Sequence, residues 1–216
     1  MTETTSGLIL RTRPLTDTSL IVHWLTPDLG RLATVARGAR QSKSAFAGKL
    51  DFGYEAGFSF QRSRRSELHA LREVSVSNPR SGLRTDYGYL AQAAYAVAFI
   101  EQATETETPL PEVHELMAGF LDHLPQQPAQ ARSVFAFELK LLSTLGLEPE
   151  AEESTLKPAV HALLGELLAA TWTELAQLNP APEDVRALRH FLHRFIIWHC
   201  QKLPKGREEA LKAGGK

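Results

Sequence analysis

Cysteine is nearly absent from this chain of 216 residues, which contains only Cys200. One cysteine forms no internal disulfide and provides no thiolate pair for a zinc ribbon. A reducing, cytoplasmic setting is the simplest fit. Long apolar runs are also missing, since the longest uncharged stretch around an apolar helix, residues 87–100, is too short to span a bilayer. Residues 1–6 are polar and carry Glu3, so we expect no secretory signal and a soluble protein without membrane contact.

The motifs of common catalytic sites are missing as well. No glycine-rich phosphate loop follows an expected strand, and neither a G-x-S-x-G turn nor an H-E-x-x-H motif occurs. His190, His193, His199 and Cys200 are close in sequence, but on a straight helix Cys200 lies roughly 10 Å along the axis from His193. Zinc ligands lie about 2.0–2.3 Å from the metal, so one ion cannot bridge that gap. We predict no catalytic residue, no cofactor and no metal; an enzyme that uses an interdomain cleft is the alternative.

Acidic residues are missing from one stretch of the first half. No Asp or Glu occurs between Leu29 and Leu50. Residues 1–80 carry 12 Lys and Arg against 7 Asp and Glu, a net charge of +5, whereas residues 81–216 carry 12 against 18, a net charge of −6. The total charge of −1 therefore conceals a basic part and an acidic part. Such asymmetry indicates that one part faces a polyanion, and excess charge on a solvated loop is the alternative.

In the basic part, apolar residues alternate with a period near two. Tyr54, Ala56, Phe58 and Phe60 share one face of such a segment. The pattern and the turn residues between segments predict five strands, at residues 7–12, 20–26, 31–36, 54–61 and 67–77. Five strands with one long connection, residues 37–51, fit a small closed barrel. The OB-fold is the commonest barrel of that size, and an SH3-like barrel is the alternative.

After Pro79 the apolar period becomes that of helices. We therefore predict an α+β protein in two parts, with an OB-fold barrel at residues 1–80 and an all-α domain at residues 81–216. In the first helix we expect a buried stripe from Tyr87 to Ala98, and in the fourth a stripe from Val160 to Leu175. Phe191 and Trp198 are off the stripe of the last helix and are expected on a second core surface, with contact to a partner as the alternative. The tail from Lys205 is expected to be frayed.

Nucleic acid in OB-folds commonly crosses strands two and three, between the first-to-second and fourth-to-fifth strand loops. Cations at these places could follow a phosphate backbone, and burying so many unpaired charges in a small barrel would be prohibitive. The aromatic residues Trp24, Phe46 and Phe52 are candidates either to stack on bases or to pack in the core. The candidate nucleic-acid-binding residues are Arg11, Arg13, Arg31, Arg37, Arg40, Lys43, Lys49, Arg62, Arg64 and Arg65.

Four blocks of the sequence, in order, resemble the RecO family of DNA repair and recombination mediators. They are Gly7 to Arg13; the basic block Thr34 to Arg40 with Lys43 to Phe46, which is the most specific; Leu83 to Asp86 with Ala94-Tyr95; and Phe137 to Leu142 with Leu145 to Pro149. The resemblance implies an N-terminal OB-fold and a helical C-terminal domain. It also implies binding of single- and double-stranded DNA, annealing of complementary strands, and partnership with RecR and the single-stranded-DNA-binding protein in loading RecA.

The chain departs from that family at one place. Many members carry a four-cysteine zinc module soon after the block that ends at Pro149, and this chain has no cysteine in Glu150 to Ser154. Zinc is therefore not expected. The acidic tail of a single-stranded-DNA-binding protein would need an apolar pocket beside a Lys or Arg, among helices that the sequence does not specify. The other reading of the barrel is an RNA-binding OB-fold module in translation or RNA processing.

Overall fold

The computed structural model describes residues 2–149 and 156–213 and divides the chain into two compact units. One unit comprises the described residues up to Ser81 together with Thr104–Ala118. The other comprises Gly82–Ala103 and the described residues from Gly119 onward. The barrel unit is therefore discontinuous in sequence, because a segment beyond the expected residues 1–80 clusters with the strands.

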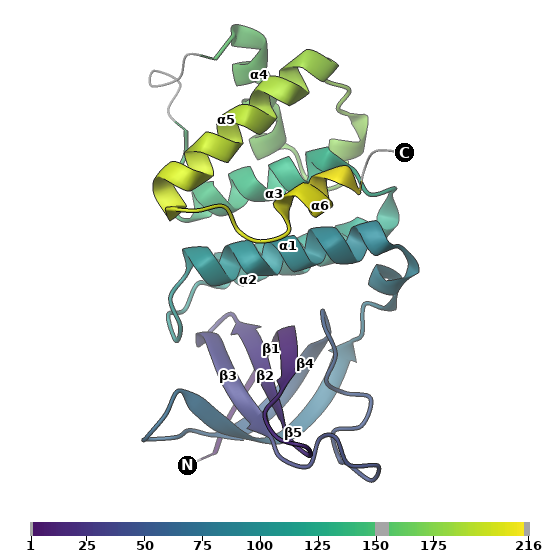
Figure 1. Ribbon diagram of the computed structural model, residues 1–216, viewed down its shortest axis with the longest axis vertical. Helices are drawn as coiled ribbons and strands as arrows, with labels where there is room; N and C mark the ends of the chain where they lie inside the picture. The colour runs from purple at the N-terminus through teal and green to yellow at the C-terminus, as the bar shows by residue number, and fades with distance from the viewer. Residues whose placement is uncertain (1, 150–155, 214–216) are drawn as a thin grey trace. The chain divides into compact units, whose positions relative to one another are not determined.

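The strands of the barrel unit close on themselves (Figure 1). They are β1 (Thr2–Pro14), β2 (Leu20–Thr26), β3 (Gly30–Ala36), β4 (Glu55–Gln61) and β5 (Leu68–Asn78), and they follow one another around the barrel in the order β1-β2-β3-β5-β4. The pairings are antiparallel except for β3 with β5, which is parallel. This topology confirms the expected OB-fold, and the SH3-like alternative is not adopted.

Alternating side chains of the strands fill the barrel interior. Trp24 is fully buried and stacks on Phe58 with ring centroids 3.9 Å apart, and its indole Nε1–H donates to Thr34 Oγ1 at 2.8 Å. Phe46, from the β3–β4 connection, belongs to the same core cluster. Trp24 therefore packs in the core and is not available to stack on a base. Phe46 packs mainly in the same core, and Phe52 is partly exposed.

The segment that returns to the barrel unit meets the start of β3. Glu107 N–H donates to the Arg31 carbonyl at 2.8 Å, next to a short parallel bridge between Arg31 and Thr106. Gly30 has a φ of +68°, and a Cβ at this position would lie 2.0 Å from the Thr108 carbonyl oxygen. Only glycine fits here, since both its left-handed conformation and the close approach of the backbone exclude a side chain.

The helical unit contains most of the helices of the chain. They are α1 (Tyr87–Ala103), α3 (Ala131–Thr144), α4 (Pro158–Ala169), α5 (Pro182–Cys200) and α6 (Arg207–Lys212), with short 3₁₀ turns at Ser81–Thr85, Leu124–Gln126 and Glu174–Gln177; α2 (Pro111–His123) begins in the barrel unit and ends in the helical one. None of the described helices has the length and apolar character needed to cross a membrane. The end of α3 is closed by Gly146 at φ +72°, where Leu147 N–H donates to the Leu142 carbonyl at 2.8 Å, as in a Schellman motif.

Four expectations about the helices were wrong. In α1, Tyr87 is 75% exposed and Ala94 is exposed, because the buried face contains Gln92, Ala93 and Val97 instead. The stripe expected to run to Leu175 is interrupted at the end of α4, at Ala169. Trp198 is 83% exposed and contacts no second core. The tail from Lys205 is not frayed throughout, since α6 buries three of its residues: Arg207, Ala210 and Leu211.

A buried ion pair fixes α6. Arg207 Nε donates to Glu138 Oε1 at 2.6 Å and Arg207 Nη2 to Glu138 Oε2 at 2.9 Å, while the Tyr95 hydroxyl donates to Glu138 Oε1 at 2.5 Å. All three side chains are nearly inaccessible to solvent. Burial and the Glu138 carboxylate hold the pKa of Tyr95 well above its ordinary value, so its hydroxyl stays protonated and remains a donor.

Candidate nucleic-acid interface

A groove of about 730 Å³ lies on the barrel at the place where OB-folds bind nucleic acid. Its walls come from the β1–β2 loop, the end of β3 with the start of the β3–β4 connection, and the β4–β5 loop with the start of β5. Its lining residues include Thr16, Thr18, Val35, Arg37, Gly38, Gln41, Gln61, Arg62, Ser63, Leu68 and Ala70. We call this hollow the barrel groove. Its chemistry is that of hydroxyl, amide and guanidinium donors over a small apolar floor, which suits a phosphate backbone.

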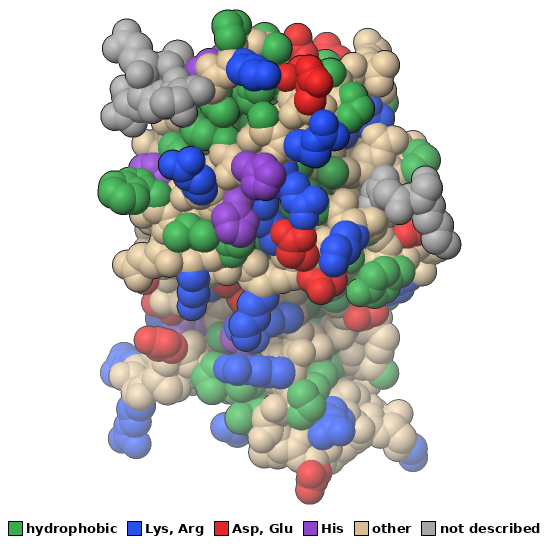
Figure 2. Space-filling model, turned by 45° about the horizontal axis from the view of Figure 1, so that its top comes forward, with side chains coloured by type: hydrophobic (Ala, Val, Ile, Leu, Met, Phe, Trp, Pro, Cys, Tyr) green, Lys and Arg blue, Asp and Glu red, His purple; other side chains and the backbone are tan. Residues whose placement is uncertain are grey.

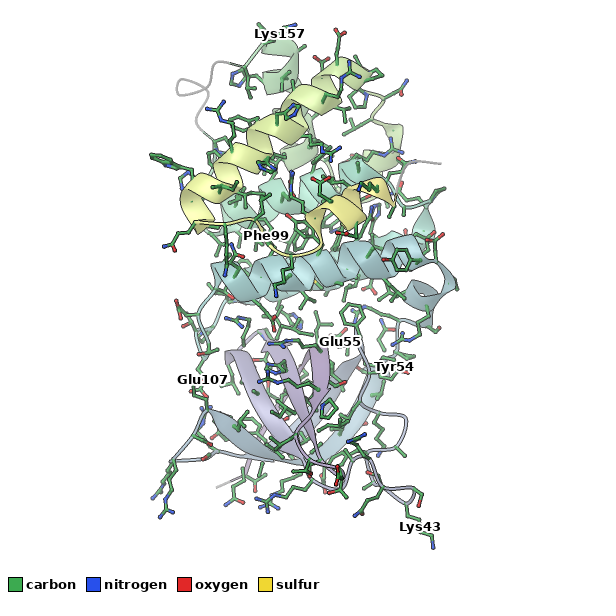
Figure 3. All side chains as sticks on the ribbon, viewed as in Figure 1. Lys43, Tyr54, Glu55, Phe99, Glu107 and Lys157 are labelled. Atoms are coloured by element: carbon green, nitrogen blue, oxygen red, sulfur yellow. The ribbon has the colours of Figure 1, made fainter. Side chains whose placement is uncertain are left out.

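The predicted cations lie at different distances from this groove. Arg37 and Arg62 line it. Lys43 projects from the far end of the β3–β4 connection, away from the strands (Figure 3). Lys49 lines a second hollow, of about 510 Å³, between this connection and β4–β5. Of the predicted cations, those that are exposed are Arg11, Arg13, Arg37, Arg40, Lys43, Arg64 and Arg65.

Arg40 joins two walls of the barrel groove. Its guanidinium Nη1 donates to the Thr16 carbonyl at 3.0 Å, and its backbone N–H donates to the Thr18 carbonyl at 3.0 Å. Both acceptors belong to the β1–β2 loop, so the start of the β3–β4 connection is fixed against that loop. Gly38 allows the chain to turn here at φ +71°. Arg40 therefore shapes the groove and also brings a positive charge to its rim.

Arg31, in contrast, is a structural residue. Its Nε donates to Thr104 Oγ1 at 2.8 Å and its Nη2 to the Thr104 carbonyl at 2.5 Å. These bonds attach the segment Thr104–Ala118 to β3. Sequence reasoning assigned Arg31 to the cationic surface because its partner is 73 residues away and leaves no local signal.

Arg62 is shared between two carboxylates. Its Nε and Nη2 form a bidentate pair with Glu3, at 2.9 and 3.1 Å, and its Nη1 donates to Glu107 Oε1 at 2.9 Å. Hydrogen bonding from Arg62 lowers the pKa of Glu3, so this carboxylate is ionised at neutral pH. The same Glu107 oxygen lies 2.6 Å from His69 Nε2. Arg62 thus lines the groove, with much of its charge already compensated.

The β4–β5 loop is held in shape by short-range bonds to one serine. Ser63 Oγ accepts the backbone N–H groups of Arg65 and Ser66, both at 3.2 Å. Ser63 N–H in turn donates to His69 Nδ1 at 3.2 Å. Because the loop backbone is fixed in this way, the exposed side chains of Arg64 and Arg65 point into solvent from an ordered base.

The sequence analysis missed two cations of the barrel unit. Arg72, on β5, is exposed, lines the second hollow with Lys49 and donates to Gln61 Oε1. A strict period of two would place Arg72 on the same face as the buried Val74, and it faces outward because the register of β5 shifts between Leu71 and Glu73. The sequence pattern therefore gave no signal for it. Arg80 is buried and pairs with Glu55 at 2.8 Å, so it stabilises the end of β5 rather than adding to the surface charge.

The helical unit contains an apolar pocket of about 220 Å³ with one cation. It is lined by α3, α4, α5 and the turn before α5, and Phe135, Leu163, Leu167 and Leu188 provide apolar walls. Arg132 lies at its edge, where Nη1 donates to the Leu178 carbonyl at 2.5 Å and the buried Nε has no hydrogen-bond partner. Burial lowers the pKa of Arg132, although a guanidinium remains charged at neutral pH.

Within residues 2–149 and 156–213, no three His, Cys, Asp or Glu side chains are grouped to hold a metal ion. The stretch Glu150 to Ser154, for which no zinc is expected, lies outside these ranges.

Comparison with known families agrees with the fold. Residues 1–80 match the family model described as recombination protein O N terminal, and residues 84–156 match the one described as recombination protein O C terminal. The chain belongs to the RecO family. The first of these RecO matches covers β1 to β5 and the second begins just before α1.

Proteins named DNA repair protein RecO are among the curated relatives. The one from Anaeromyxobacter sp. (strain K) is 32% identical over 144 residues, which are 67% of this chain and 57% of the relative. The one from Pelobacter propionicus is 31% identical over 150 residues, 69% of this chain and 61% of the relative. The one from Bacillus pumilus is 30% identical over 147 residues, which are 68% of this chain and 57% of the relative. The matched part thus spans less than two thirds of each of these RecO proteins.

Proposed function

We propose that this chain is a DNA repair and recombination mediator that binds single- and double-stranded DNA in the barrel groove and anneals complementary strands. In this role it helps to load RecA onto strands covered by the single-stranded-DNA-binding protein, with RecR as a partner. The observation that supports the proposal best is the barrel groove itself, which lies between the loops that OB-folds use and has Arg37, Arg40, Arg64 and Arg65 on or near its walls. The names of the relatives point in the same direction.

The proposed mechanism needs no covalent step. Cations that neutralise phosphates release condensed counterions, so affinity falls with salt by about 0.7 in log K per phosphate contact and per log unit of salt for single strands. Neutralisation also lowers the repulsion between two strands that are held on one protein. Their pairing then proceeds from the bases alone.

A double charge reversal tests the assigned surface. We expect Arg37→Glu/Arg40→Glu to lower the affinity for a labelled single strand at least tenfold in fluorescence anisotropy and to slow annealing in parallel. Loss of about two phosphate contacts should reduce the salt slope by about 1.4. The matched control is Lys157→Glu/Lys212→Glu, which makes the same charge change at two exposed positions of the helical unit. Wild-type affinity and annealing in the barrel variant would show that the surface is wrongly assigned.

Competition separates DNA from RNA as the ligand. Unlabelled RNA of matched sequence is titrated against a bound labelled DNA strand at fixed salt. We expect RNA to compete no better than DNA. A clear preference for RNA would contradict the repair function and favour the RNA-processing alternative.

The pocket beside Arg132 supports a second part of the proposal, the docking of the acidic tail of the single-stranded-DNA-binding protein. A terminal carboxylate would satisfy the buried Arg132 Nε, and an apolar side chain next to it would enter the space between Phe135 and Leu188. We expect Arg132→Met to weaken the binding of an acidic peptide with an apolar last residue by about ten- to a hundredfold, as hydrogen bonds to charged groups are worth about 1.5–3 kcal/mol. The same peptide with a C-terminal amide is the control, and equal binding of both peptides to the wild type would contradict this docking mode.

A further inference from the structure

The acidic half of the chain contains a basic stretch of its own. Between Asp184 and Glu208 there is no Asp or Glu, although residues 81–216 carry six more acidic than basic residues. The cations in this stretch are Arg186, Arg189, Arg194, Lys202, Lys205 and Arg207. Arg207 is buried against Glu138, and the others lie on or just after α5.

Helix α5 separates this charge from its apolar side chains. Leu188, Leu192 and Ile196 are buried at a spacing of four residues. Residues on the opposite side of the helix recur at spacings of three and four and form what we call the α5 outer face: Arg186, Arg189, His190, His193, Arg194, Ile197 and Trp198. Figure 2 shows Lys, Arg and His side chains gathered on this side of the helical unit. Glu208 pairs with Arg189 at 2.5 Å and leaves the charges of Arg186 and Arg194 exposed.

An exposed indole ends the row of cations. Trp198 is 83% exposed and the neighbouring Ile197 is 39% exposed, whereas Trp24 is fully buried and Trp172 packs at a tilt against Phe120 and His123. An indole this exposed buries little apolar surface against the helical unit, so packing there does not explain its position. Guanidinium groups beside a free aromatic ring are the combination with which proteins hold single strands, since the cations follow the backbone and the ring stacks on a base.

The dimensions of the α5 outer face fit a short stretch of strand. From Arg186 to Trp198 the helix rises about 18 Å, which is the length of about five nucleotides at about 3.4 Å each. An acidic protein segment would also meet the charge, and it is the competing occupant that the experiment below separates from a single strand. The charge and the free ring together therefore favour nucleic acid.

We propose that the α5 outer face is a second site for single-stranded DNA, with Arg186 and Arg194 on the phosphates and Trp198 stacked on a base. This inference rests on the proposed annealing function, because a protein with two strand sites can bring two complementary strands together. The barrel groove then holds one strand and the α5 outer face the other.

Tryptophan fluorescence of the full chain tests the site, with an oligothymidine as the probe. Stacking on Trp198 quenches its emission, so the wild type should show saturable quenching and Trp198→Phe should lose it. Arg186→Glu/Arg194→Glu should weaken the quenching affinity at least tenfold, and Trp198→Ala should weaken it about fivefold or more. Lys157→Glu/Lys212→Glu controls for net charge, and Tyr87→Ala controls for removal of an exposed aromatic ring.

The barrel variant distinguishes the two sites. If both assignments hold, Arg37→Glu/Arg40→Glu keeps the Trp198 quenching and Arg186→Glu/Arg194→Glu keeps binding in the barrel groove, while each variant slows annealing. Quenching that persists unchanged in Trp198→Phe, or that disappears in the barrel variant, would overturn the second site and leave the barrel assignment intact. Quenching by an acidic peptide but not by the oligothymidine would overturn it as well, in favour of a protein partner.

Discussion

The arginine residues of the barrel unit differ in what they bind. Arg31, Arg62 and Arg80 are all held by acceptors within their own unit, whereas Arg37 lines the groove with an exposed guanidinium. A cation whose charge is already shared gains less from a phosphate, because the pair must be broken or stretched first. We therefore expect the contribution of an arginine to the proposed DNA binding to depend on its hydrogen-bond partners more than on its position in the sequence.

One buried histidine, His123, should make the stability of the protein depend on pH. Burial and, secondarily, Arg132 lower the pKa of His123 below its ordinary 6.5, and the ring packs 5.4 Å from Trp172. The unfolded chain then binds the proton more readily than the folded one, so the free energy of unfolding should fall as the pH drops below about 6.5.

We expect His123→Gln to reduce this loss between about pH 7 and about pH 5. Urea unfolding at several pH values, followed by tryptophan fluorescence, measures it. His190→Gln, at an exposed position, is the control. An unchanged pH slope in His123→Gln would show that other groups carry the effect.

At the scale of elements, the sequence predicted the strands better than the helices. Strand β3 alternates strictly between buried and partly exposed residues, so the period of two placed it to within a residue. Strand β2 is buried on both faces and was found from its apolar run and the turn residues on either side of it. Helix α1 is buried on several sides, with Gln92, Ala93 and Phe99 all covered, and so has no single stripe to find. Helix α6 is fixed by Glu138, 69 residues away, which no local pattern can show. The groove loops were predictable from the fold, but the partners of Arg31 and Arg62 were not.

The buried pair is the main attachment of α6 that can be altered by one substitution. Arg207→Met leaves the Glu138 charge buried without its cation, which should cost about 3–5 kcal/mol of unfolding free energy. The double variant Arg207→Met/Glu138→Leu removes both charges and should be more stable than the single one. Chemical denaturation compares the two, and a double variant less stable than Arg207→Met would contradict this account.

Each of the two units combines segments that are separate in the sequence, so no single position in the chain separates them. The first 81 residues contain the five strands of the barrel unit, but β3 also contacts a segment that follows α1. Arg31 donates a hydrogen bond to Thr104, and Gly30 lies against the Thr108 carbonyl. Residues 104–118 thus act as a strap on β3 that is provided from beyond α1.

A fragment that ends at Ser81 should therefore form a weakened barrel. It lacks the two Arg31 bonds to Thr104 and the bond from Glu107 N–H, together worth about 3 kcal/mol at about 1 kcal/mol each. Hydrogen exchange of the β3 amides should be about a hundredfold faster in the fragment than in the whole chain. A fragment that ends at Ala118 is the control, and equal protection in both fragments would mean that the strap adds no stability.

The discontinuity of the barrel unit also orders events during synthesis. All five strands are synthesised before α1. The hydrogen bond between Arg31 and Thr104 can form only after residues 104–118 have also been synthesised. Domains normally fold in the order in which they emerge. The barrel unit therefore begins to fold first but is completed only after α1 has been made. Until then the growing chain has a closed sheet in which Arg31 lacks its two bonds to Thr104 and the backbone of Thr108 does not yet lie against Gly30.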